Sequence, residues 1–240
     1  EFYGANGESW TDEQDVDGTL PNTLERDTVT VYNGVSCFHG IAPLKAVGTS
    51  KASMRRQRAT TWQNAMAAYP GDTIEVWAAM YMVAAASYAN HWFMDFSQAG
   101  DGPFGLVPSA ASNWDCRFKM PTQVIALDFS EWGGAATNAD VNGRTPVIPT
   151  GAWFTFHLWY RLSDKDGSGL VRIEIDGVET FCRSNLKNMA SVADIALLAL
   201  VLNKPLFDGY EIGATACTNT TGDLDMRFDN VLYRVIRQQR

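Results

Sequence analysis

The chain has 240 residues, of which 46% are hydrophobic, and it lacks a run of about 18 apolar residues that could span a membrane. Its 19 basic and 27 acidic side chains give a formal net charge of -8, which disfavours nucleic acid as a partner because a polyanion would be repelled. Eight Trp, 20 Gly and the absence of a dividing linker or internal repeat favour one large β-sandwich domain.

The first part of the chain predicts a polar lead-in followed by strands. Residues 1–25 have few periodic apolar positions, so we expect an extended segment before a domain that spans residues 26–240. Alternation of Val with Thr predicts the first strand at Asp27–Gly34, and a second is predicted at Lys51–Arg58. Apolar residues at helical spacing predict one short helix at Ala59–Tyr69.

A long strand is predicted at Asp72–Val83, with Ile74 and Val76 on one face and Glu75, Trp77 and Tyr81 on the other. His91–Ser97 continues the alternation. Two short strands, Asp115–Met120 and Gln123–Phe129, are predicted as a hairpin around Pro121.

The region Gly151–Phe181 has the clearest strand pattern of the chain. Phe154, Phe156, Leu158 and Tyr160 lie on one face, and His157, Trp159 and Arg161 on the other. The return strand places Val171, Ile173 and Ile175 opposite Arg172 and Glu174, and ends in the turn sequence Asp176-Gly177. This region predicts a hairpin with one core face and one polar face.

Further along, Ile195–Leu202 predicts a strand buried on both faces, Asn203–Asp223 a loop, and Asp225–Ile236 the last strand. The four cysteines, Cys37, Cys116, Cys182 and Cys217, have no CxxC spacing, which disfavours zinc. They allow three disulfide pairings, and buried free thiols are the equal alternative.

The hairpin with its closing IDGV, and the terminal strand RFDNVLYRVI, resemble the central hairpin and last strand of concanavalin A-like and laminin G-like domains. The resemblance implies an all-β, single jelly-roll β-sandwich of two curved antiparallel sheets. It covers lectins, carbohydrate-binding modules, polysaccharide lyases and viral shell or tail proteins, so the fold does not select one activity. It also implies that the concave outer face forms a ligand groove. Domains of this kind often hold calcium, and by resemblance Asp229 is the candidate ligand. A buried Asp that caps backbone amides is the equal alternative, so we assign no cofactor.

Alternation predicts which side chains line a saccharide groove. Aromatic rings stack on sugar faces, and Arg with Glu holds hydroxyls or carboxylates. The candidate ligand-binding residues are Trp77, Tyr81, His157, Trp159, Arg161, Arg172 and Glu174. The alternative is structural: both Trp lie under loops or in an interface, and Arg161 and Glu174 form a cross-strand ion pair.

Catalysis is the less favoured reading. No E-x-D-x-E run supplies the carboxylate pair of a related glucanase. A polysaccharide lyase acting on a uronate polymer would use a base and cations, and His157, Arg161 and Arg172 are the candidates, although the Q-I-H and Y-F-K types of motif of alginate lyases are absent.

We therefore expect a non-catalytic glycan-binding or adhesion module outside the cell. Its partner would be a polysaccharide or surface glycan. The alternatives are a virion or cell-surface structural protein that contacts neighbouring subunits through the same sandwich, and the lyase.

Overall fold

Two seven-stranded antiparallel sheets make up the described part of the chain. The computed structural model describes residues 2–3, 9–14, 23–42, 50–56, 71–83, 91–98, 117–119, 126–128, 142, 147–163, 168–186, 207–217 and 223–238. Within these residues, no helix is long and apolar enough to cross a membrane. The helix predicted at Ala59–Tyr69 and the strand predicted at Ile195–Leu202 lie outside the described residues.

The inner sheet, as we name it from its position, has the strand order β1-β2-β5-β13-β7-β8-β9. In that order its strands are β1 (Phe2–Tyr3), β2 (Ser9–Gln14), β5 (Ser50–Arg56), β13 (Phe207–Cys217), β7 (His91–Gln98), β8 (Arg117–Lys119) and β9 (Ala126–Asp128). Its strands β1 and β2 come from residues 1–25. These two strands are extended, as expected for the lead-in. They also belong to the inner sheet, because β1 pairs with β2 and β2 pairs with β5.

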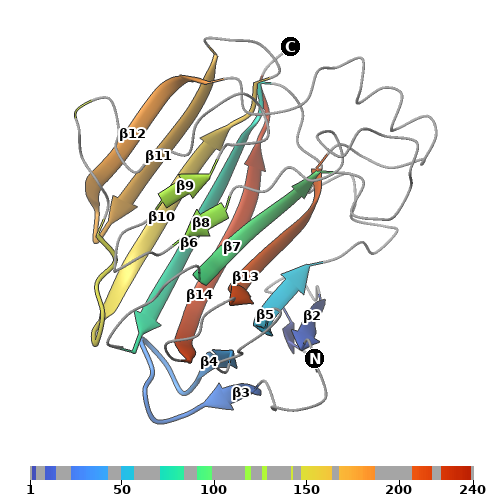
Figure 1. Ribbon diagram of the computed structural model, residues 1–240, viewed down its shortest axis with the longest axis vertical. Coiled ribbons are helices and arrows are strands. Elements are labelled where there is room, and N and C mark those ends of the chain that lie inside the picture. Colours follow the sequence, from blue (N-terminus) through green and yellow to red (C-terminus); the bar gives the residue numbers. More distant parts are fainter. Residues whose placement is uncertain are drawn as a thin grey trace, which may run out of the picture.

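The outer sheet has the strand order β12-β11-β10-β6-β14-β4-β3. In that order its strands are β12 (Val178–Leu186), β11 (Gly169–Ile175), β10 (Trp153–Arg161), β6 (Thr73–Met82), β14 (Leu224–Ile236), β4 (Cys37–Ala42) and β3 (Thr23–Asp27). Figure 1 shows the inner sheet lying in front of the outer one. This arrangement confirms the predicted all-β sandwich.

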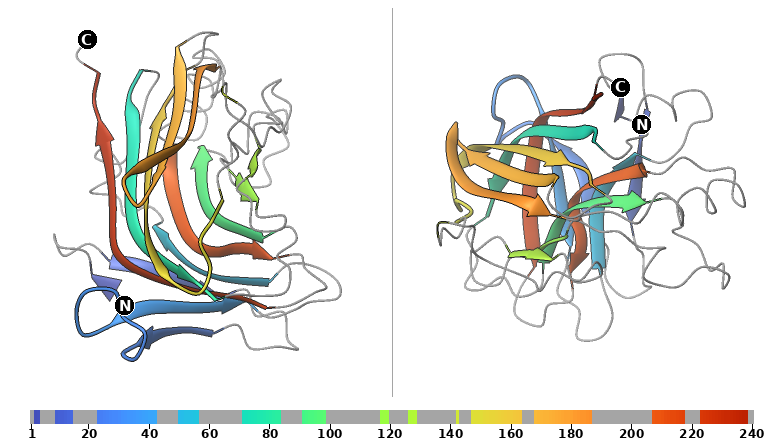
Figure 2. Two further views of the ribbon diagram at one scale, coloured as in Figure 1. Left: turned by 90° about the vertical axis from the view of Figure 1, so that its left-hand side faces the viewer. Right: turned by 90° about the horizontal axis from the view of Figure 1, so that it is seen from above.

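Both sheets curve in the same sense, and the outer sheet lies on the outside of the curve (Figure 2). The face of the outer sheet that points away from the inner sheet is therefore convex. The concave surface belongs to the inner sheet, on its side away from the outer sheet. A ligand groove of the expected kind would follow that concave surface.

The core lies between the sheets and is filled by the alternating apolar residues of the outer sheet. Phe154, Phe156, Leu158 and Tyr160 of β10 are at most 1% exposed. They lie beside the equally buried Ile74, Val76, Ala78, Met80, Val171, Ile173, Phe181, Met226 and Phe228. Full burial of one such large apolar side chain contributes about 1.5–3 kcal/mol, so this alternation fixes which face of each strand is internal.

The predicted turn at Asp176-Gly177 is confirmed. Both residues have positive φ angles, 52° and 74°, which is the pattern of a type I′ turn between two strands. The N–H of Asp176 donates to the carbonyl of Thr155, and the carboxylate of Asp176 accepts from the N–H of Thr155 at 2.8 Å. The turn is thus tied back to β10.

Two sequence predictions are wrong. The predicted strand at Asp27–Gly34 ends where it was expected to begin, since β3 stops at Asp27. The Asp27 carboxylate accepts hydrogen bonds from the N–H groups of Val29 and Thr30, which turns the chain out of the sheet. In the second case, β13 lies within the predicted loop Asn203–Asp223 and is the central partner of both β5 and β7.

A chain of charged side chains joins the edge strand β3 and its neighbour β4 to β14. Arg227 donates to Asp27 at 2.6 Å and to Asp225 at 3.1 Å, and Asp225 lies 2.7 Å from Nε2 of His39. Nδ1 of His39 lies 3.3 Å from the carboxylate of Glu25. The hydrogen bond from Arg227, and then that from the N–H of Val29, lower the pKa of Asp27 to about 2.

Cys37 carries a free thiol. Burial raises the pKa of Cys37 to about 11, so its thiol stays protonated at neutral pH. Cys116 and the side chain of Cys217 lie outside the described residues.

The lowered pKa of Asp27 predicts an acid-dependent contribution to stability. Because the folded-state value lies below the ordinary 3.8, this contribution is present above pH 4 and is lost as the pH falls toward 2. We expect Asp27→Asn to be less stable than wild type at pH 5, with the difference shrinking between pH 4 and pH 2. Urea unfolding of both proteins at each pH measures this. A constant difference across that window would contradict the assignment.

Candidate functional site

The outward, convex face of the outer sheet brings together five of the seven residues predicted to bind ligand. Register places Trp159 of β10 between Glu75 of β6 and Arg172 of β11, and His157 between Trp77 and Glu174. The same two rows continue into β14, where Arg234 pairs with Glu75 and Leu232 with Trp77. We call these eight residues the outer-face cluster.

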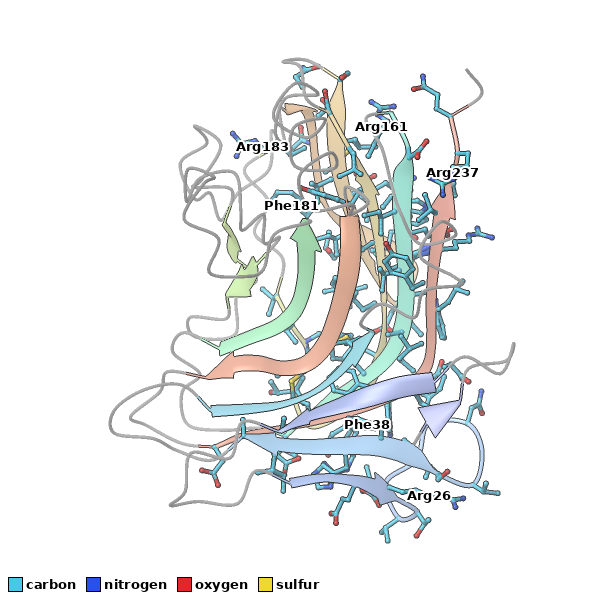
Figure 3. The ribbon with its side chains drawn as sticks, turned by 90° about the vertical axis from the view of Figure 1, so that its right-hand side faces the viewer. Arg26, Phe38, Arg161, Phe181, Arg183 and Arg237 are labelled. Carbon is cyan, nitrogen blue, oxygen red and sulfur yellow. The ribbon has the colours of Figure 1, made fainter. Side chains whose placement is uncertain are left out.

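Two predicted residues lie away from the cluster. Arg161 is in register with Thr73 and Leu170, one row beyond Trp159, and its Nε donates to the carbonyl of Ser168 at 2.8 Å. Figure 3 shows it at the same end of the sheet as Arg237 and far from Arg26. Tyr81 is four residues from Trp77, about 13 Å along the strand. Its ring contacts Trp153 edge-on, at 5.7 Å between centroids.

The cluster is centred on a buried carboxylate that the ligand-binding prediction did not include. Glu75 is 4% exposed, and its Oε1 lies 2.7 Å from Nε2 of His157. Its Oε2 accepts a hydrogen bond from Nε of Arg234. Glu75 shares a strand face with Trp77, so alternation gives its direction. Its partners depend on how β6 aligns with β10 and β14.

Opposing effects act on the pKa of Glu75. Burial works to raise it, because a charged carboxylate loses hydration. The hydrogen bonds from Arg234 and His157 outweigh burial and hold the pKa below its usual value. Glu75 is therefore ionised at neutral pH and fixes the orientation of the His157 ring.

Ring contacts hold the remaining members in place. The rings of His157 and Trp159 lie 3.5 Å apart between centroids, tilted by 32°. The guanidinium carbon of Arg172 lies 4.8 Å from the centroid of Trp159, within the range of a cation–π contact. Two neighbours on the same face thus cover Trp159.

Arg172 is also neutralised by carboxylates. Its Nη2 donates to Glu174 at 2.5 Å. Its Nε lies 3.0 Å from the carboxylate of Glu179. The two groups form an ion pair, but they are not aligned for a hydrogen bond. The cross-strand ion pair between Arg161 and Glu174, which the structural alternative predicted, is not formed. Register places Glu174 opposite His157, whereas Arg161 is opposite Leu170.

The calcium candidate Asp229 binds backbone amides. Its carboxylate accepts from the N–H of Asn230 at 2.8 Å and from the N–H of Asn33 at 3.4 Å. Among the described residues, no three His, Cys, Asp or Glu side chains are arranged to hold a metal ion. Calcium at Asp229 stays a prediction.

The concave surface of the inner sheet is a second candidate site, defined by backbone register. Ile212 and Ala52 are fully buried, and Ile212 pairs with Met54 and Met94. The adjacent row therefore belongs to the opposite, concave face. That row places Glu211 between Arg55 and Asp95. One cationic and two acidic residues thus stand side by side across the centre of this sheet.

Replacing Glu75 tests the outer-face cluster. We expect Glu75→Ala to lower the free energy of unfolding by about 1–3 kcal/mol, because two donors lose a buried acceptor. Arg234→Ala should cost less, since Arg234 is 58% exposed along its side chain. Urea denaturation measures both, and Glu75→Gln, which keeps the volume, is the control. Equal stability of all the variants would contradict this account.

Comparison with solved structures supports the fold. Endo-β-1,4-glucuronan lyase from the fungus Trichoderma reesei matches with a TM-score of 0.59 at 13% identity, over 98% of this chain and 93% of that chain. The cellulose induced protein Cip1 matches with a TM-score of 0.59 at 15% identity, over 95% and 94%. The alginate lyase Aly36B matches with a TM-score of 0.52 at 13% identity, over 87% and 84%.

No protein-family model and no curated protein sequence matches the chain. At these identities the structural matches define the fold and not the activity. The chain has the concanavalin A-like jelly-roll fold.

Proposed function

We propose that this protein is a polysaccharide lyase that cleaves a uronate-containing polymer in a groove along the concave face of the inner sheet. The proposal is carried by the row in which Arg55, Glu211 and Asp95 stand side by side on that face. The likeness of the whole chain to a glucuronan lyase adds support.

The chemistry of a lyase explains why this row matters. A base removes the proton at C5 of the uronate. The electrons of that C–H bond form a double bond between C4 and C5, and the bond from C4 to the leaving oxygen breaks. The leaving oxygen takes up a proton. Negative charge develops on the carboxylate side of the sugar, so a cation beside the carboxylate lowers the barrier. Arg55 is the arginine of the described concave row.

Two titratable residues on the concave face are candidates for the base. Glu211 is the register neighbour of Arg55. His91 is on the same face of β7 as Asp95, four residues and about 13 Å away along the strand. Separate Glu211→Gln and His91→Ala variants distinguish them, since only loss of the base should abolish turnover and retain binding of the polymer.

The outer-face cluster is less suited to this reaction. Both of its arginines already have carboxylate partners, Arg172 with Glu174 and Arg234 with Glu75. A uronate carboxylate would have to displace these partners before its charge could be stabilised. The surface is also convex, so a polymer would contact it over a shorter length (Figure 2).

A polymer substrate places such an enzyme outside the cell, which is our proposal for its location. The alternative of a virion or cell-surface structural protein stays a prediction. It would require assembly with neighbouring copies, which light scattering of the purified chain would detect.

Turnover of a panel of uronate polymers tests the proposal, because each elimination creates an unsaturated uronate that absorbs ultraviolet light. We expect absorbance to rise with at least one polymer. Arg55→Ala should reduce the rate about 100- to 1000-fold, the usual effect of removing one electrostatic donor. An unchanged melting transition would show that the variant is folded.

Arg161→Ala is the matched control, because it removes a guanidinium group from the opposite, outer sheet. Its rate should stay within about twofold of wild type, by the small effect of substitutions away from a site. Loss of turnover in Arg161→Ala with full activity in Arg55→Ala would move the site to the outer face. Absence of absorbance change with every polymer would overturn the lyase.

A further inference from the structure

The outer-face cluster is organised more tightly than a solvated sheet face requires, and the proposed lyase reaction does not use it. Its two arginines, its histidine and its three carboxylates, counting Glu179, are held in fixed pairs. A set of polar side chains that is already immobilised loses little entropy when a ligand binds. Such a surface is suited to binding a ligand without rearrangement.

Trp77 is the aromatic platform of the cluster. It is half-buried and, unlike Trp159, has no ring partner among the described residues. On one side it is in register with Leu232, which is 45% exposed, and on the other with His157. An indole beside an exposed aliphatic side chain offers an apolar area that can cover one flat ligand face.

His157 supplies a hydrogen-bonding group at the edge of this platform. Its Nε2 faces Glu75, and among the described residues nothing bonds to its Nδ1. When the neutral ring donates its Nε2 proton to Glu75, its Nδ1 is an acceptor, and the carboxylate and the contact with Trp159 fix the direction of that acceptor. Glu174, the next residue in the same row, adds carboxylate oxygens on the far side of His157.

The charges of the cluster select the ligand. The arginines are paired with carboxylates, and the register neighbours of Trp77 are His157 and Leu232. An anionic sugar on Trp77 would meet the carboxylates of Glu75 and Glu174 without an unpaired cation to balance it. A neutral sugar ring can place its C–H face on the indole and donate its hydroxyls to His157 and Glu174.

We propose that the convex face of the outer sheet carries a second, non-catalytic carbohydrate site, centred on Trp77 and His157, that takes a neutral pyranose unit. The site is separate from the groove of the proposed lyase and does not depend on that activity. Because the face is convex, it would contact a few sugar units of a longer chain. It would hold the protein on a neutral polysaccharide.

Titration calorimetry with a neutral β-1,4-linked glucose hexamer tests this site. We expect saturable binding by wild type and at least a tenfold weaker affinity in Trp77→Ala. Trp153→Ala is the control, because Trp153 lies on the same sheet face but in the separate ring cluster with Tyr32 and Tyr81. Its affinity should stay within twofold of wild type, with thermal melting confirming that both variants are folded.

Two further variants distinguish this site from the groove. Glu174→Gln should weaken binding of the hexamer, whereas Arg55→Ala should leave that binding unchanged even if it abolishes lyase turnover. Loss of hexamer binding in Arg55→Ala would place the ligand in the groove and overturn the second site. Absence of saturable binding by folded wild type, or equal affinity in Trp77→Ala, would overturn it as well.

Discussion

The pairing of β6 with β10 is the constraint on which the rest of the outer sheet depends. Nine consecutive residues of β10 are in register with β6 without a bulge, so every second position on both strands is internal. Fully buried Phe156 and Ala78 face each other in one row, and the half-exposed His157 and Trp77 in the next. A slip of β10 by one residue would expose its phenylalanines and bury the polar side chains of His157 and Arg161. The cost of burying such groups makes the register unique.

Curvature then gives the two sheets different surfaces. The nested arrangement leaves a convex face lined by paired charges and rings, and a concave face crossed by Arg55, Glu211 and Asp95. On the convex face, ion pairs hold the side chains and neutralise them. A long polymer can follow the concave face over many residues. The same jelly roll therefore has two surfaces of opposite curvature, one for each of the two sites that we propose.

The sequence allowed the strongest strands to be predicted because their alternation is complete. This is true of β6, β10 and β11, and of the outward set that contains Trp77, His157 and Arg172. The strand β13 could not be recognised, since Gly209 and Gly213 interrupt its pattern and irregular register lets it depart from strict period two. Val29 and Val31 have the spacing of a strand, but the hydrogen bond from the N–H of Val29 to the side chain of Asp27 turns the backbone out of the sheet before them.

The partners within the candidate sites could not be predicted at all. His157 and Glu75 are 82 residues apart, so their contact depends on the alignment of β6 with β10 rather than on a local motif. Alternation also separates two faces without indicating which way a sheet bends. That is why the sequence could group the outer-face residues but could not place the concave surface on the other sheet.

The bulge in β14 has a consequence for how this protein behaves in concentrated solution. At Asn230, where φ is 51°, the strand leaves β4, and from there to Ile236 β6 is its only pairing partner among the described strands. An unpaired strand edge is a template onto which a second molecule can add. Arg234 and Arg237 lie on or just beyond this edge, with side chains 58% and 43% exposed. Besides forming ion pairs within the sheet, these long charged side chains hinder the approach of the same edge of another copy.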